Sequence, residues 1–220
     1  MSEYELELNN NNIYLIAGVD EAGRGPLVGP VVSACVVLPK DYELEKLNDS
    51  KKLSEKLREE LFVQINKDAL GIGVGIVDNN RIDEINILEA TKESMIMAIN
   101  NCFKITDIEH VLIDAVKLNI DIPNTSIIKG DSKSKSIAAA SIIAKVTRDK
   151  IMYELDKKYP MYDYKNNKGY PTKKHLELIN KYGIINEYRK TYSPIKKNVD
   201  KSWQSCKNVY NTNSKEGHVC

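Results

Sequence analysis

Two apolar runs flank a short acidic and glycine-rich segment in IYLIAGVDEAGRGPLVGPVVSACVVL, residues 13–38. Ile13–Val19 and Val28–Leu38 are rich in β-branched residues and predict two strands. The segment Gly23–Pro30 holds three glycines and two prolines, which predicts the turn between them. Asp20 and Glu21 close the first predicted strand. Since neighbouring strand residues point to opposite faces, a bend just after this pair is needed if both are to serve one site.

The rest of the chain predicts alternating groups of strands and helices. Gly71, Gly73 and Gly75 alternate with apolar residues, so one face of that strand is bare backbone and another element should pack closely on it. Strands followed by helices, twice over, indicate an α/β fold: a mixed sheet flanked by helices, with a small C-terminal helical appendage. The further predicted strands are 70–77, 111–113 and 126–128, and the predicted helices are 54–69, 87–102, 135–159 and a shorter one after Pro171.

Composition is that of an ordinary globular protein. The 220 residues are 42% hydrophobic and 29% charged, and no apolar stretch approaches the roughly 20 residues that span a bilayer. Residues 1–12 carry three glutamates where a signal peptide would be positive, so we expect a cytoplasmic protein without membrane association. The four cysteines form no Cys-x-x-Cys pair, which argues against a disulfide framework or a zinc site.

The net charge of +1 conceals a strong division along the chain. Residues 1–128 hold 12 basic and 22 acidic side chains, whereas residues 129–201 hold 18 basic and 8 acidic ones. A basic block joined to an acidic one is typical of an enzyme that binds phosphates with one part and cuts them with another. A solvated lysine-rich surface explains the same numbers, so charge supports this interpretation without deciding it.

Several acids follow buried apolar runs, where an ionised carboxylate is costly unless a cation or hydrogen bonds compensate it. Asp20 and Glu21 follow the first strand, Asp114 follows 111–113, and Asp131 lies just beyond 126–128, with Asp149 on the long helix as its competitor. Carboxylates are the ligands that Mg²⁺ and Mn²⁺ prefer, and phosphodiester hydrolysis uses two such ions about 3.5–4 Å apart. For each acid taken alone, a cap, a turn or an ion pair remains the alternative.

Other residues are suited to contact a nucleic acid. The two glycines of the turn after the acid pair let a polyanion approach the backbone, and a hydroxylated aromatic can contact a sugar or stack on a base. The alternatives are a plain turn for Gly23–Gly25, a solvated helix surface for residues 50–52 and core packing for Tyr170. The candidate substrate-binding residues are Gly23, Arg24, Gly25, Ser50, Lys51, Lys52, Ser141, Lys145, Arg148 and Tyr170.

Taken together, six blocks closely resemble bacterial ribonuclease HII, in the order of that family. They are GVDEAGRGPLVGPVV, DSKKLS, VLIDA, KGDSKS, AAASIIAKVTRD and GYPTKKH, and the resemblance spans about Tyr14–Trp203. It implies a ribonuclease H-like fold and endonucleolytic cleavage of RNA in RNA:DNA hybrids and at ribonucleotides embedded in duplex DNA. Products would carry 5′-phosphate and 3′-hydroxyl ends, and the setting would be replication and ribonucleotide repair. About a dozen polar residues precede the first predicted strand, whereas ribonuclease HIII carries a sizeable N-terminal domain, so we expect the chain to resemble ribonuclease HII rather than HIII.

The resemblance also assigns roles. Its metal ligands match Asp20, Glu21, Asp114 and Asp131, which favours Asp131 over Asp149, and the cofactor would be two Mn²⁺ or Mg²⁺ ions. The family's Gly-Arg-Gly turn, here Gly23–Gly25, and its loop tyrosine, here Tyr170, would read the 2′-hydroxyl. We therefore divide the chain into a polar extension (1–12), a catalytic domain (13–159), a helical substrate-binding appendage (160–203) and a flexible tail (204–220).

Two other functions remain possible on the sequence. One is a ribonuclease H-like DNA nuclease, such as a resolvase, and the other is a non-catalytic nucleic-acid-binding module that uses the basic third alone. Cleavage at a single embedded ribonucleotide separates the first from our interpretation. The second predicts that Asp20→Asn changes nothing measurable, whereas we expect that substitution to abolish Mn²⁺-dependent cleavage. We expect a monomer, and no obligatory protein partner is visible in the sequence.

Overall fold

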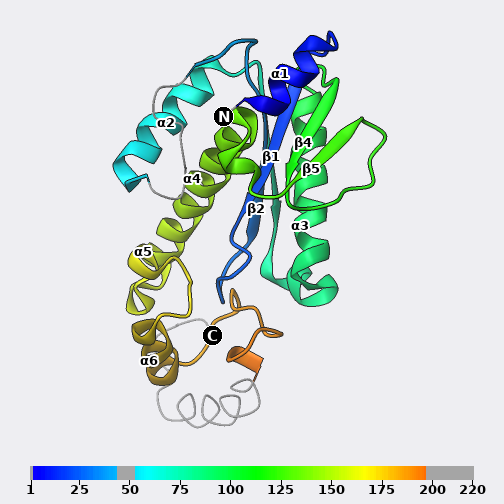
Figure 1. The fold of residues 1–220 in the computed structure, drawn as a ribbon. Coiled ribbons are helices and arrows are strands. Elements are labelled where there is room, and N and C mark those ends of the chain that lie inside the picture. Colours follow the sequence, from blue (N-terminus) through cyan, green and yellow to red (C-terminus); the bar gives the residue numbers. More distant parts are fainter. Residues whose placement is uncertain (1, 44–52, 197–220) are drawn as a thin grey trace.

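A computed structural model describes residues 2–43 and 53–196. Its centre is a five-stranded sheet in the order β3-β2-β1-β4-β5 (Figure 1). The pairs β1–β2 and β2–β3 are antiparallel, whereas β1–β4 and β4–β5 are parallel, so the predicted mixed sheet is confirmed. The strands are β1 (Ile16–Ala22), β2 (Val31–Val37), β3 (Gly71–Val77), β4 (His110–Asp114) and β5 (Asn124–Ile127).

Helices cover both faces of the sheet (Figure 1). One face packs on α3, and the opposite face packs on α4 and α2. Two 3₁₀ turns, at 130–132 and 160–162, flank α4. The helices are α1 (Glu3–Asn10), α2 (Glu55–Asp68), α3 (Asn79–Phe103), α4 (Lys135–Lys158), α5 (Tyr164–Asn167) and α6 (Lys173–Tyr182).

Glycines let both helical layers approach the sheet backbone. A Cβ on Gly73 would lie 2.0 Å from the Ala98 carbonyl oxygen, and one on Gly75 would lie 2.0 Å from that of Ser94. Both partners belong to α3, so the close packing predicted for the bare face of β3 is confirmed. On the other face, a Cβ on Gly18 would lie 2.0 Å from the carbonyl carbon of Ser136, in the first turn of α4.

Side-chain caps at the predicted residues start two of the helices. Ser54 and Thr172 accept hydrogen bonds from the third residue after them, at the starts of α2 and α6. Asn86 caps the second half of α3 as predicted, since its side chain accepts from the backbone N–H of Leu88 and Glu89. The sequence analysis did not predict the first half of α3, which begins at residue 79, because its polar first residues show no helical periodicity.

The structure also differs from the sequence analysis at the N-terminus and at the end of β1. Residues 3–10, predicted only as a polar extension, form α1. The strand predicted to end at Val19 continues through Ala22, so Asp20 and Glu21 lie within β1 and pair with Ala34 and Ser33. The turn begins only at Gly23, whose φ of 98° is in the left-handed region that glycine adopts readily.

Residues 160–196 fold against the loop between β1 and β2. Leu27 and Val28 of that loop are buried in one cluster with Tyr162, Tyr164 and Tyr188. Backbone hydrogen bonds from Leu27 N to Gly169 O (2.8 Å) and from Arg189 N to Leu27 O (2.8 Å) fix the contact. Within the described ranges, no helix is long and apolar enough to cross a membrane. The predicted boundaries at 159 and 203 stay predictions, and the tail 204–220 lies outside the described residues.

We predict that Gly73→Ala destabilises the protein by about 1–3 kcal/mol, because its methyl group would collide with the α3 backbone, which cannot move alone. Gly71→Ala is the matched control on the same strand, since its nearest neighbours are side-chain atoms of Thr106 and Cys102. Urea unfolding of both variants measures the difference. A loss for Gly73→Ala no larger than that for Gly71→Ala would contradict the packing argument.

Candidate active site

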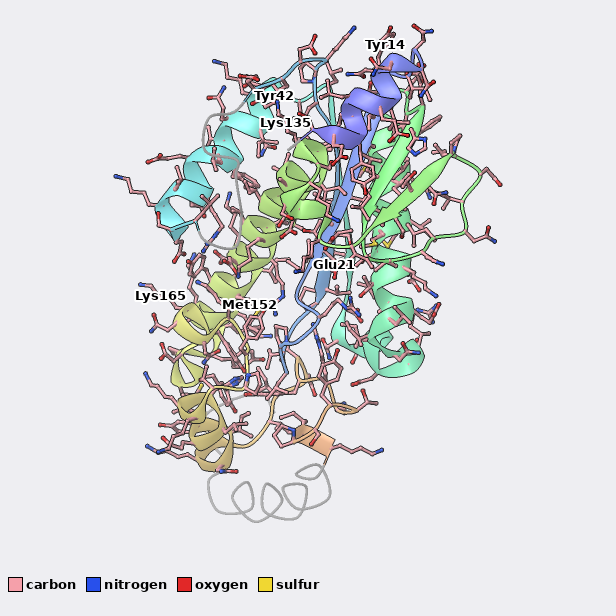
Figure 2. All side chains as sticks on the ribbon, in the orientation of Figure 1. Tyr14, Glu21, Tyr42, Lys135, Met152 and Lys165 are labelled. Atoms are coloured by element: carbon pink, nitrogen blue, oxygen red, sulfur yellow. The ribbon has the colours of Figure 1, made fainter. Side chains whose placement is uncertain are left out.

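A pocket of about 390 Å³ opens at the end of β1 that faces the C-terminal helices, where Figure 2 labels Glu21. It is lined by the predicted acids Asp20, Glu21 and Asp114, by the turn that follows β1, and by one face of α4. Sequence positions more than a hundred residues apart therefore meet in one place. The predicted candidates that line it are Asp20, Glu21, Gly23, Arg24, Gly25, Asp114, Ser141, Lys145, Arg148 and Tyr170.

The parallel pairing of β1 with β4 brings two of the acids together. Val19 pairs with Ile113, so the next residues, Asp20 and Asp114, emerge at the same edge of the sheet. Glu21 follows directly, and it reaches the same pocket without a bend between it and Asp20. The bend that the sequence analysis expected just after this pair corresponds to the turn that begins at Gly23, where the strand ends.

Burial and the repulsion between neighbouring charges make Asp20 and Glu21 hard to ionise. Asp20 is only 5% exposed, and desolvation, then the charges of Glu21 and Asp114, raise its pKa well above the ordinary value. Burial also raises the pKa of Glu21, although Arg24, 3.3 Å away, opposes the rise. The Glu21 Oε2 atom is buried and lacks a hydrogen-bond partner among the described residues. A cation would compensate all of these groups, so the donor set fits a divalent metal.

Asp131 lies in the 3₁₀ turn next to this group and is 4% exposed. The turn is tied to the site because Gly130 N donates a 2.7 Å hydrogen bond to Asp114 Oδ1. Asp131 does not line the pocket, and nowhere in residues 2–43 and 53–196 are three or more potential ligands already gathered around a metal-sized point. The role of Asp131 as a metal ligand therefore stays a prediction.

The competitor Asp149 has a different partner. Its Oδ1 accepts a 2.6 Å hydrogen bond from Lys145 Nζ, and the pair is largely buried. Burial lowers the pKa of Lys145, and Asp149 counteracts that effect. Asp149 does not line the pocket, whereas Lys145 and Ser141 do. Hydrogen bonding from Ser141 favours the ionised form of Asp20, which gives this serine a role at the acids that the sequence did not indicate.

Gly25 and Tyr170 face each other across the pocket rim. A Cβ on Gly25 would lie 3.4 Å from Tyr170 Cε1, so the ring packs over the turn, and Tyr170 remains 41% exposed. The structure thus brings together the Gly23–Gly25 turn and Tyr170, the two features predicted to contact the 2′-hydroxyl. Gly23 is more constrained, since a Cβ there would lie 2.1 Å from Arg148 Nε.

Two buried arginines stabilise the loop that contains this turn by donating hydrogen bonds to its backbone carbonyls. Arg148 donates 3.1 Å hydrogen bonds to the carbonyls of Val28, Pro30 and Lys168, so it joins the turn region to the segment before Tyr170. The sequence predicts a phosphate contact for Arg148, which stays a prediction. The described partners of its guanidinium are backbone carbonyls and the Met152 sulfur.

Arg189 is the second arginine, and sequence reasoning missed it. It donates to the carbonyls of Gly23 (2.6 Å), Arg24 (3.0 Å) and Gly29 (3.0 Å). Burial, then the charge of Arg189, lowers the pKa of Arg148 to about 10, so Arg148 stays charged at neutral pH. No local pattern could reveal Arg189, because its partners lie some 160 positions earlier in the chain.

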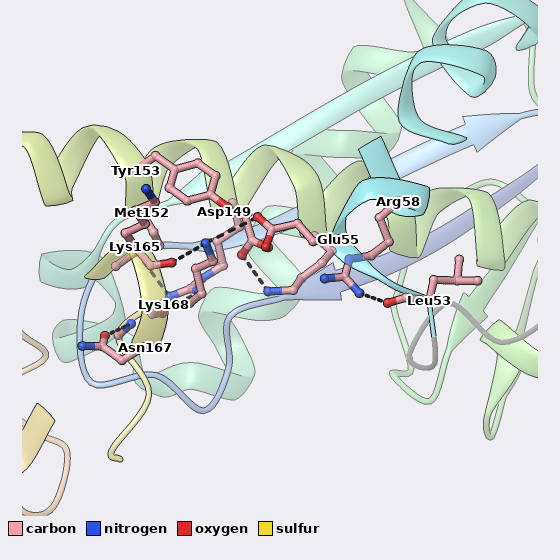
Figure 3. A network of polar contacts seen from close by, with 12 residues as sticks. Leu53, Glu55, Arg58, Asp149, Met152, Tyr153, Lys165, Asn167 and Lys168 are labelled. Carbon is pink, nitrogen blue, oxygen red and sulfur yellow. Dashed lines mark hydrogen bonds and ion pairs between the residues drawn. The ribbon is translucent and has the colours of Figure 1, made fainter. Parts of the chain in front are cut away.

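A polar network joins α2, α4 and the segment before Tyr170 (Figure 3). Lys168 Nζ lies 3.6 Å from the centre of the Tyr153 ring and 3.8 Å from Glu55 Oε1, which also accepts from the Tyr153 hydroxyl. Arg58 of α2 lines the pocket and donates to the Leu53 carbonyl, a contribution the sequence analysis did not identify. The predicted contacts Ser50, Lys51 and Lys52 precede this helix and lie outside the described residues.

Comparison with known proteins agrees with this geometry. The family model described as Ribonuclease HII matches residues 17–199. Ribonuclease HII of Bacillus mycoides (strain KBAB4) is 55% identical over 201 residues, covering 91% of this chain and 77% of the relative. Its counterpart in Bacillus cytotoxicus is 56% identical over 196 residues, covering 89% and 75%.

Solved structures show the same fold. Ribonuclease H2 from Pyrococcus horikoshii OT3 matches with a TM-score of 0.69 and 27% identity, over 90% of this chain and 99% of that one. RNase HII of Archaeoglobus fulgidus, solved in complex with PCNA, matches with a TM-score of 0.68 and 28% identity, over 81% and 95%. The predicted ribonuclease H-like fold is confirmed, and the chain belongs to the ribonuclease HII family of endoribonucleases.

Proposed function

We propose that the pocket at the end of β1 is the active site, where the RNA strand of hybrids and single ribonucleotides in duplex DNA are hydrolysed. The observation that carries this proposal is the group Asp20, Glu21 and Asp114 at one end of the sheet: the raised pKa values of Asp20 and Glu21 disfavour their ionisation, and Glu21 Oε2 is buried without a described partner. Asp20, Glu21, Asp114 and Asp131 would hold two Mn²⁺ or Mg²⁺ ions. When bound, such ions activate water and stabilise the leaving oxygen, which would give 5′-phosphate and 3′-hydroxyl products.

The residues around the acids orient the substrate in this proposal. The turn 23–25 offers backbone groups to the ribose, with Tyr170 packed on Gly25 and its ring exposed at the rim. Ser141 and Lys145 face the pocket from α4, where a hydroxyl and an ammonium group can contact phosphates. The helical segment 160–196 would act as the substrate-binding appendage, because it supplies Tyr170 and Arg189, which donates to the backbone of the 23–25 turn. The monomeric state and the cytoplasmic location stay predictions.

We predict that Asp20→Asn lowers Mn²⁺-dependent cleavage by more than about 100-fold, since even groups that only support metal ligands contribute 10- to 100-fold. Binding of an RNA:DNA hybrid should be largely kept. The metal-free variant should unfold at the same or a higher temperature, because the raised pKa of Asp20 means that its ionised form opposes folding at neutral pH.

Asp121→Asn is the control, since it removes one acid from an exposed position away from the pocket. Cleavage of a duplex with one embedded ribonucleotide, calorimetry and hybrid binding measure the three properties. Cleavage by Asp20→Asn at the unsubstituted rate would exclude the proposed mechanism, and an intact embedded ribonucleotide with the unsubstituted protein would favour a resolvase-like activity.

We predict that Tyr170→Phe reduces kcat/KM at a single ribonucleotide about 2- to 10-fold, the effect of one lost hydrogen bond. Tyr170→Ala should cost about 10- to 100-fold, because it also removes a stacking surface. Tyr182→Phe, exposed on α6, is the matched control. The measurement is the ratio of cleavage at ribose and at deoxyribose in otherwise identical duplexes, and an unchanged ratio in both Tyr170 variants would remove this residue from recognition.

We predict that Arg189→Gln weakens selectivity for ribose and lowers stability by at least about 3 kcal/mol, since buried carbonyls lose charged donors. Lys190→Gln makes the same charge change on an exposed neighbour and should alter neither property. Urea unfolding and the ribose-to-deoxyribose cleavage ratio are the measurements. Equal stability of the two variants would show that Arg189 does not hold the turn.

A further inference from the structure

Helix α1 lies outside residues 17–199, the part of the chain that the family model matches, yet it is packed into the fold. In Figure 1 it crosses one end of the sheet, beside the first turn of α4. Its apolar residues Tyr4 and Leu8 are one helical turn apart and pack on a cluster drawn from β1, β4, β5 and α4. The buried members of that cluster are Ile16, Leu112, Ile127 and Ile137. These are the elements that carry or adjoin the proposed metal ligands.

Glu5 on the same helix is bonded to the N-terminus of α4. Its Oε1 accepts a 2.6 Å hydrogen bond from Ser134 Oγ and a 3.1 Å bond from Ser136 N. Ser134 is the N-cap of α4, and its Oγ accepts from Ile137 N. A carboxylate at this position satisfies backbone donors and interacts favourably with the helix dipole. Glu5 Oε2 is buried without a described partner, so these contacts with α4 are what stabilise the carboxylate.

The capped turn leads directly to the acidic group. Ser134 N and Lys133 N donate to the Gly130 carbonyl, at 2.8 and 2.9 Å, and Gly130 N donates to Asp114 Oδ1. A Cβ on Gly130 would lie 2.5 Å from Ile137 Cδ1, so the turn is also packed against the first turn of α4. A continuous set of contacts therefore links Glu5 through Ser134 and Gly130 to Asp114. Asp131 lies in the same turn as Gly130.

We propose that Glu5 is a positioning residue for the metal-binding carboxylates: by capping α4 from a separate helix, it fixes the 129–134 turn and with it Asp114 and Asp131. This inference rests on the proposed role of these two acids as metal ligands. Removing the Glu5 carboxylate frees Ser134 and the start of α4, so the turn samples more conformations. Divalent cations then bind less tightly, because part of their binding free energy is used to order the turn.

The test compares Glu5→Ala and the milder Glu5→Gln with Glu7→Gln, which changes the charge of an exposed residue on the same helix. Amide hydrogen exchange over residues 129–137 of the metal-free protein measures the order of the turn. Mn²⁺ titration followed by electron paramagnetic resonance measures cation affinity without any activity assay. We expect Glu5→Ala to accelerate exchange in this segment and to weaken Mn²⁺ binding about 10-fold or more. Glu5→Gln should have smaller effects, and Glu7→Gln should have none.

Unchanged exchange over 129–137 in Glu5→Ala overturns the inference. The inference is also overturned if Glu5→Ala shows faster exchange and a lower unfolding temperature but unchanged Mn²⁺ affinity. That combination is expected of a residue with a purely structural role. The variant Asp131→Asn distinguishes an error in the role of Glu5 from an error in the proposed metal-binding role of Asp131. If Asp131→Asn binds Mn²⁺ as tightly as the unsubstituted protein, the assigned role of Asp131 is wrong, whereas the exchange data still decide whether Glu5 holds the turn.

Discussion

The contact between Gly18 and the first turn of α4 is the constraint on which the site depends. With hydrogen as its side chain, Gly18 lets the α4 backbone rest directly on β1, two residues before Asp20. The helix then runs along the sheet, so that Ser141 and Lys145 reach the pocket in which β1 ends. The 3₁₀ turn that precedes α4 is placed beside β4 by the same contact. Any larger residue at 18 would displace the helix and separate the acids from the residues that accompany them.

This arrangement carries an electrostatic cost that the fold has to offset. Desolvation and like charges raise the pKa of Asp20, and burial raises that of Glu21, so ionising them in the metal-free protein opposes folding at neutral pH. A ligand that binds only the folded state adds to its stability, and a divalent cation would do so at the point of greatest repulsion. The large buried clusters on both faces of the sheet provide the stability that makes such a site tolerable.

The sequence predicted most of the regular structure because local signals determine it. The alternating glycines of β3 predicted the close helix contact, and Thr172 predicted the start of α6, since each effect depends on residues adjacent in the chain. Arg189 could not be found in this way, because its carbonyl partners are distant in sequence. Helix α1 was missed for a related reason: its apolar contacts are only two residues among glutamates and asparagines, and its stabilising partner, the start of α4, follows more than a hundred positions later.

The charge division of the chain takes on a more specific meaning in the structure. Of the basic residues in the C-terminal third, Arg148 and Arg189 are buried and bind carbonyls of the turn region, and Lys145 is paired with Asp149. Two of these positive charges therefore stabilise the loop between β1 and β2 from its buried side, where a guanidinium can satisfy several carbonyls at once. The exposed lysines that the structure describes in this segment can attract a polyanion at long range. In the proposed function, affinity for a nucleic acid would depend on the exposed lysines and selectivity on the two buried arginines, because the lysines act through solvent and the arginines through the backbone of the turn region.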